Sequence, residues 1–250
     1  MRRLVAAEWL KLWTVRATGW TLGGTVAVAT GFGALIGTSF RDHARSDAAP
    51  HFAGSYGLML AQLCLVVFAV RAMGDEYTSG TIRASLLAAP RRGGFYAAKV
   101  VATALAVAVV AALSVAGSFL AAQATMGEAG VAPWSAGAPR ALLGGWLYLM
   151  LMALLALGVT SVVRRSAAAL GVLLPLLLLG SQGLANIPRV GTVLQFLPDQ
   201  AAGLLLGMAG PPDDPTFARA YGPWTGMAIT ACWAAAALAA GWWTLRRRAV

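Results

Sequence analysis

The stretch KVVATALAVAVVAALSVAGSFLAAQATMGE, Lys99 to Glu128, has a charged residue at each end and none between them. A helix needs about 20 apolar residues to cross about 30 Å of hydrocarbon at 1.5 Å per residue. This uncharged run is longer than that, and alanine, valine and leucine dominate it. It predicts a transmembrane α-helix.

The whole chain has the composition of a membrane protein. Its 250 residues are 59% hydrophobic and 11% charged, whereas a soluble domain carries about 25% charged residues. We therefore predict an all-α polytopic membrane protein that forms one domain over residues 1–250. Six transmembrane helices are expected, at Ala17–Phe40, Phe52–Val70, Phe95–Ala122, Ala141–Val163, Ala167–Ile187 and Trp224–Leu245.

The distribution of Lys and Arg predicts the orientation. With the N-terminus inside, fourteen of the 19 Lys and Arg residues fall in inner segments and five in outer ones. Cytoplasmic loops carry such an excess, so both termini are expected in the cytoplasm, as in a multi-pass protein of a bacterial plasma membrane. The net charge of +10 is then a sign of topology, and we expect contact with the lipid bilayer and none with nucleic acid.

The first sixteen residues predict a helix in the cytoplasmic interface. Its tryptophans have helical spacing and suit headgroup depth, while acidic and basic residues fall on other sides. A plain N-terminal extension of the first span is the alternative. The residues assigned to this interfacial helix are Glu8, Trp9, Lys11, Trp13 and Arg16.

Small residues recur along the first predicted span. Gly19, Gly23, Ala27 and Gly31 are four apart, and Gly33 begins a second series, Gly33-x-x-x-Gly37. Such stripes allow helix backbones to approach closely in lipid. We favour packing within the chain over a dimer seam.

The outer segment at residues 188–223 contains two apolar pieces, Leu194–Leu197 and Ala201–Met208, interrupted by Pro198. Neither piece is long enough to cross a membrane. Short re-entrant or interfacial helices are expected, which need protein to cover their backbone at membrane depth.

The sequence contains no motif of an enzyme. A P-loop requires glycine directly before its lysine, but Leu10 precedes Lys11 and Ala98 precedes Lys99. His43 and His51 have no cluster of other metal ligands around them. We therefore expect no catalytic residue, metal or cofactor in this chain.

Neutral polar residues interrupt the apolar spans. They provide helix–helix hydrogen bonds, which is the interpretation we favour, or line a weakly polar substrate path. The candidates for such a path are Gln62, Ser114, Ser118 and Gln182.

Residues 74–94 separate the second and third spans and carry charge, glycine and proline. A helix is expected over Thr81–Ala88, capped by Thr78 or Ser79 and stopped by Pro90. Such a short helix is not stable alone and must pack against something. Its apolar contacts would come from Ile82 and Leu86 on one face, with Arg83 and Leu87 on the neighbouring one.

Three basic residues lie where the chain re-enters the third span. Arg91, Arg92 and Lys99 are expected at the inner headgroups, where they would hold the chain as it re-enters the membrane.

The stretch GDEYTSGTIRASLLAAPRRGGFYAAK, Gly74 to Lys99, closely resembles the first cytoplasmic loop of type-2 ABC exporter permeases. The matching positions are Gly74, Glu76, Tyr77, Gly80, Thr81, Ile82, Arg83, Pro90, Arg92 and Lys99. The N-terminal segment also resembles that family's interfacial helix, at Glu8, Lys11, Arg16 and Trp20.

This resemblance implies a coupling helix that seats on a separate cytoplasmic ATPase, which would hold the ATP and Mg. It also implies a second permease, either another copy or a paralogue. The implied coupling residues are Glu76, Tyr77, Gly80, Thr81, Ile82, Arg83, Leu86, Leu87, Pro90 and Arg92. A non-transporting scaffold or sensor that docks a different partner through the same loop is the alternative.

Overall fold

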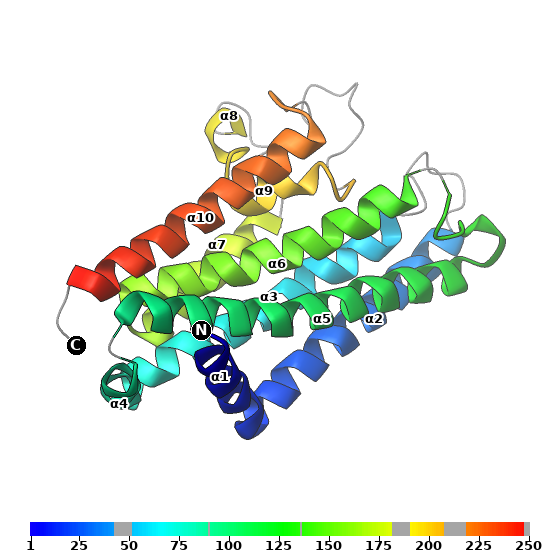
Figure 1. Ribbon diagram of the computed structural model, residues 1–250. Coiled ribbons are helices and arrows are strands. Elements are labelled where there is room, and N and C mark those ends of the chain that lie inside the picture. The colour runs from blue at the N-terminus through cyan, green and yellow to red at the C-terminus, as the bar shows by residue number, and fades with distance from the viewer. Residues whose placement is uncertain (43–51, 90, 136, 182–190, 208–218, 248–250) are drawn as a thin grey trace.

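The computed structural model describes residues 1–42, 52–89, 91–135, 137–181, 191–207 and 219–247, and these contain helices and no strand (Figure 1). The elements are α1 (Arg2–Thr14), α2 (Arg16–Asp42), α3 (Phe52–Thr78), α4 (Thr81–Ala88), α5 (Arg92–Met126), the 3₁₀ turn η1 (Gly127–Ala129), α6 (Ala138–Val163), α7 (Ser166–Ser181), α8 (Gly191–Leu194), α9 (Pro198–Gly203) and α10 (Pro223–Arg247).

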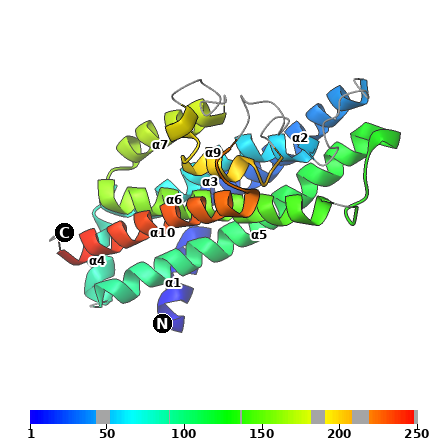
Figure 2. The same ribbon diagram turned by 90° about the horizontal axis from the view of Figure 1, so that it is seen from above.

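The long helices form one bundle around α3 and α6 (Figures 1 and 2). Helix α2 packs along α3 and α5, and α10 packs along α6. Helices α2, α3, α5, α6 and α10 are long and apolar enough to cross a membrane. These five confirm five of the six predicted spans as helices of the required length and composition.

The predicted span Ala167–Ile187 is described only in part. Helix α7 covers Ser166–Ser181 with Pro175 inside it. Its 16 residues extend about 24 Å, which is less than the hydrocarbon thickness of about 30 Å. Residues 182–187 lie outside the described residues, so the sixth span stays a prediction.

The N-terminal segment forms a helix separate from the first span. Val15 has extended backbone (φ −94°, ψ 112°), so α1 ends at Thr14 and α2 begins at Arg16. Helix α1 crosses the bundle at an angle (Figure 1). The alternative of a continuous N-terminal extension is therefore wrong.

The small residues of α2 divide into two sets. A Cβ on Gly33 or Gly37 would come within 2.6 Å of atoms of α5, so these two allow α2 and α5 to approach closely. Around Gly19, Gly23 and Gly31, by contrast, a Cβ would meet nothing within 4 Å. Packing within the chain is thus confirmed for the second series and wrong for the first, which faces outward.

The predicted outer segment contains α8 and α9. Pro198, which the sequence suggests as an interruption, separates α8 from α9 as the first residue of α9, where its missing N–H costs nothing. Thr230 of α10 donates a hydrogen bond of 2.8 Å to the Pro198 carbonyl, which holds α9 against the bundle.

Candidate functional site

The turn from α3 to α4 is made at Gly80, whose φ of +72° lies in the left-handed region that glycine adopts without steric cost. The N-cap of α4 is Gly80, so the predicted N-cap at Thr78 or Ser79 is wrong. Both hydroxyls donate backward, from Thr78 to the Gly74 carbonyl and from Ser79 to the Asp75 carbonyl. Ser79 Oγ also accepts a long hydrogen bond of 3.5 Å from the N–H of Thr81, the first residue of α4.

Helix α4 has an anchored face and an exposed face. Its predicted extent is confirmed. Ile82 is 2% exposed and belongs to the core, and Leu86 packs against the core. On the neighbouring face Arg83 is exposed, and Leu87 is 85% exposed. The short helix is thus held by two apolar side chains and presents a leucine and an arginine outward.

Four charged side chains from three helices meet at the same end of the bundle, which we call the α4 end. Lys99 of α5 donates to Glu8 Oε2 of α1 at 2.6 Å and to Glu76 Oε1 of α3 at 2.8 Å. Lys11 of α1 donates to Glu8 Oε1 at 2.7 Å and to Glu76 Oε1 at 3.2 Å. We call Glu8, Lys11, Glu76 and Lys99 the ion cluster.

Each ammonium of the ion cluster makes three hydrogen bonds. The third bond of Lys99 goes to the Ala72 carbonyl at 3.2 Å, and the third bond of Lys11 goes to Ser85 Oγ of α4 at 3.0 Å. The cluster therefore links α4 to α1, α3 and α5. One acceptor, Glu76 Oε2, is buried and has no partner among the described residues.

The charges of the ion cluster stabilise one another. Burial raises the pKa of Glu8, but the charge of Lys99 and the hydrogen bonds from Lys11 and Lys99 outweigh it, so that this pKa lies below its ordinary value. Burial lowers the pKa of Lys11, but hydrogen bonding to Glu8 and the charge of Glu76 raise it above its ordinary value. Glu8 and Lys11 are therefore both charged at neutral pH.

Two members of the ion cluster are more deeply buried than the sequence predicts. Lys99, expected at the headgroups with Arg91 and Arg92, is 3% exposed. Glu8, expected on the polar side of an interfacial helix, is buried, while Trp13 of the same helix is exposed. One signal was available: Lys99 falls inside the predicted third span, and a charge within a span almost always pairs.

Tyr77 of α3 lies beside Arg164, the residue that follows α6. The guanidinium of Arg164 stands 5.6 Å from its ring centre, and Arg164 also donates to the Thr244 carbonyl of α10 at 2.9 Å. Tyr77 thus contributes to the packing of α3 against the ends of α6 and α10. Of the other predicted coupling residues, Arg92 donates to the Leu245 carbonyl at 3.2 Å, and Pro90 lies outside the described residues.

A cleft of about 470 Å³ lies beside the ion cluster, between α1, α2, α3 and α4. Its lining combines charged groups of the cluster with hydroxyls of α4 and apolar residues of α1 and α3. Lining residues include Glu8, Lys11, Glu76, Ser85, Leu12 and Phe68.

A protein-family model described as an ABC-2 family transporter protein matches residues 4–180. The match covers well over half of the chain and includes the ion cluster and α4. The chain belongs to the ABC-2 transporter family. This confirms the resemblance carried by the two N-terminal motifs, and α8, α9 and α10 follow the matched residues. No curated protein matches the chain.

Three path candidates of this ABC-2 chain lie inside its helix bundle. Gln62 and Ser118 are fully buried, as is Ser114. Tyr148 of α6 donates a 2.5 Å hydrogen bond to Gln62 Oε1, and Ser118 donates a 2.7 Å bond to the Gly54 carbonyl. The hydroxyl of Ser114 and the amide nitrogen of Gln62 have no partner among the described residues. Gln182 lies outside the described residues.

Asp199 is a buried acid that sequence reasoning missed in this ABC-2 chain. Asp199 on α9 is 3% exposed. Its Oδ2 accepts a 2.9 Å hydrogen bond from Gln200, while Oδ1 is buried without a partner among the described residues. Burial raises its pKa above the ordinary value.

Proposed function

We propose that this ABC-2 family chain is the membrane-spanning permease subunit of an ATP-driven exporter, with ATP and Mg bound by a separate cytoplasmic ATPase. The α4 end then faces the cytoplasm of a bacterial cell, as the Lys and Arg distribution predicts. The observation that carries this proposal is the outward face of α4, with Leu87 85% exposed.

Leu87 is exposed outside the hydrocarbon layer. Helix α4 follows the last residue of one candidate span and precedes the first residue of the next, so the hydrocarbon core is not expected to cover it. An apolar side chain exposed there beside Arg83 has the chemistry of a partner contact, since exposed apolar surface rimmed by polar residues marks interaction sites and Arg is enriched among interface anchors. The ATPase is the partner that family membership implies.

The ion cluster supplies a route for force from α4 into the membrane. Ile82 and Leu86 fix α4 on the bundle, and the bond from Lys11 to Ser85 ties it to the cluster. A push on α4 by closing ATPases would then move the ends of α1, α3 and α5 together. Glu76 acts in this proposal through neighbouring helices, and Arg83 acts at the ATPase.

We further propose that two permeases, either two copies or one copy and a paralogue, form the transporter. If Gln62, Ser114 and Ser118 contact cargo, α3 and α5 must separate to expose them, because all three are buried within one chain.

Co-purification tests the function. The chain is expressed with the ATPase encoded by a neighbouring gene, as wild type, as Leu87→Ser and as Arg83→Ala. We expect each substitution to reduce the bound ATPase about fivefold or more, as for an interface anchor worth at least about 1 kcal/mol. Arg165→Ala, which removes an exposed arginine at the same end, is the matched control and should have no effect. A wild-type chain that binds no ATPase would favour the scaffold or sensor.

A further inference from the structure

A second cavity of about 470 Å³ lies at the α4 end, between the first turn of α5 and the last turn of α10. Its lining residues are Arg91, Arg92, Gly93, Gly94, Trp242 and Arg246. Three of these six are arginines and none is acidic. We call this cavity the arginine groove.

Contacts with α10 position two of the three arginines. Arg92 donates to the Leu245 carbonyl at 3.2 Å. The guanidinium of Arg246 stands 4.5 Å from the centre of the Trp242 ring. Stacking on an aromatic face leaves the N–H edge of a guanidinium available to an anion. The three acidic residues of the segments expected in the cytoplasm bond elsewhere, two of them in the ion cluster and Asp75 to Arg71.

The backbone adds to the positive potential. The groove includes the start of α5, a helix of 35 residues whose N-terminal end favours negative charge. A Cβ on Gly93 would lie 3.1 Å from Trp242 Nε1, so the glycine allows the indole to come close to this first turn. The groove thus combines arginine N–H edges, a helix start and an indole N–H. A phosphate group could accept hydrogen bonds from all of them.

The position of the groove indicates where the phosphate comes from. Candidate spans begin at Arg92 and end at Arg247, and we therefore infer that the groove lies near headgroup depth. Exposed apolar side chains follow along α5, at Val101 and Leu105. A phosphate held in the groove can therefore have its acyl chains against these side chains.

We propose that the arginine groove binds the phosphate headgroup of an anionic phospholipid in the leaflet at the α4 end. The site is separate from the outward face of α4 and does not depend on the proposed ATPase partner. It gives the transporter a specific lipid contact at the junction of α5 and α10.

The test uses the full chain purified in non-ionic detergent and native mass spectrometry to count bound molecules. Three probes are titrated: a phosphatidylglycerol, a phosphatidylcholine and glycerol phosphate without acyl chains. We expect one saturable phosphatidylglycerol site and at least about tenfold weaker binding of the other two probes. Since one arginine near a membrane surface contributes about 1 kcal/mol toward an anionic lipid, Arg246→Gln should weaken the site about fivefold. Arg91→Gln combined with Arg246→Gln should weaken it about thirtyfold.

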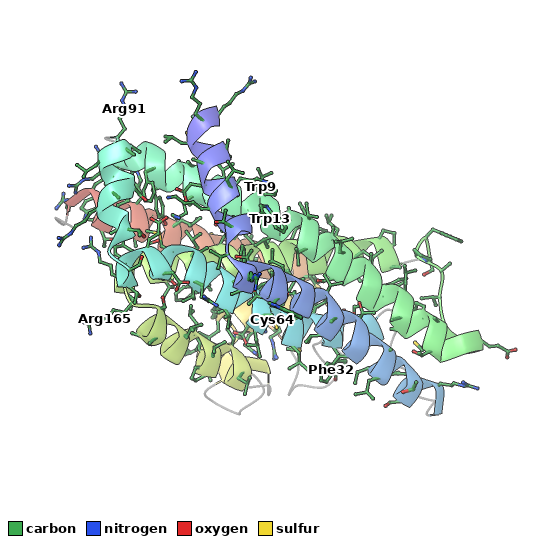
Figure 3. All side chains as sticks on the ribbon, turned by 90° about the horizontal axis from the view of Figure 1, so that it is seen from below. Trp9, Trp13, Phe32, Cys64, Arg91 and Arg165 are labelled. Atoms are coloured by element: carbon green, nitrogen blue, oxygen red, sulfur yellow. The ribbon has the colours of Figure 1, made fainter. Side chains whose placement is uncertain are left out.

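Arg165→Gln is the matched control, because it removes one exposed arginine at the same end on the other side of the molecule (Figure 3). An equal loss of phosphatidylglycerol affinity with Arg165→Gln would show that net charge alone explains the effect, and this would overturn the site. Glycerol phosphate binding as tightly as the lipid would overturn the lipid assignment in favour of a soluble phosphate. Variants that bind phosphatidylglycerol normally but lose the ATPase would assign the groove to a protein contact.

Discussion

Lys99 Nζ and Glu8 Oε2 lie 2.6 Å apart although 91 positions separate them in the sequence. The contact fixes the N-terminal helix α1 on α5, and both side chains are almost fully buried. Because Glu76 shares the same ammonium, one lysine holds α1 and α3 together at the end where α4 is attached.

Replacing Lys99 should destabilise the protein strongly. Lys99→Met leaves Glu8 and Glu76 buried with only the half-exposed Lys11 as counter-charge, and breaking a buried pair costs about 3–5 kcal/mol. Arg71→Met breaks an exposed pair with Asp75 and should cost about 0.2–1 kcal/mol. Unfolding by SDS in mixed micelles, followed by circular dichroism, measures both. Equal losses for the two variants would mean that the buried pair does not stabilise the bundle.

The ion cluster should make stability depend on pH at both extremes. The folded pKa of Glu8 lies below its ordinary value of about 4.3, so its contribution is complete above that value and is lost as pH falls through the lowered pKa. The folded pKa of Lys11 lies above about 10.4, so its contribution is lost as pH rises through the raised pKa.

Measuring the free energy of unfolding from about pH 3 to about pH 11 tests both the acid and the alkaline loss of stability. Glu8→Gln should flatten the acid limb, and Lys11→Gln should flatten the alkaline limb. Profiles that stay parallel to the wild type would contradict the assignment.

The hydrogen bond from Tyr148 to Gln62 should contribute modestly to stability. Tyr148→Phe removes a 2.5 Å bond between α6 and α3, and such bonds between membrane helices contribute about 0.6 kcal/mol, with a maximum near 1.7. A double-mutant cycle with Gln62→Leu gives the coupling energy. Zero coupling combined with altered transport in Gln62→Leu would favour a role on the substrate path over a structural one.

Asp199 should destabilise the folded chain when it is ionised. Its folded pKa lies above the ordinary value of about 3.9, so stability is complete below that value and is lost as pH rises through the raised pKa. Asp199→Asn should therefore be more stable than wild type near neutral pH and similar below about pH 3.9. Greater loss of stability near neutral pH in the asparagine variant would show that an unseen positive partner stabilises the carboxylate.

Much of the fold follows from local patterns in the sequence. Uncharged windows identified α2, α3, α5, α6 and α10, because twenty apolar residues in a row leave few alternatives to a spanning helix. The spacing of Ile82 and Leu86 likewise predicted the inner face of α4. These features depend on neighbours within one helix, which sequence displays directly.

The site was less predictable, because it depends on contacts between distant segments. Charges near a span end suggest headgroup anchors, and only the folded chain shows that Lys99 turns inward to Glu8. The cap at Gly80 was missed because two nearby hydroxyls were competing candidates for the same role. Asp199 was missed because an acidic residue outside a span gives no sign of burial by α10.

The most direct measurement of the central claim is thiol labelling at position 87. Cys64 and Cys232 are first replaced by alanine, and Leu87→Cys and Arg165→Cys are then compared, since both positions are exposed at the α4 end. We predict that bound ATPase slows maleimide labelling about tenfold or more at position 87 and leaves position 165 unchanged, because an interface centre excludes water. Unchanged labelling at position 87 in a complex that still contains the ATPase would contradict docking on α4.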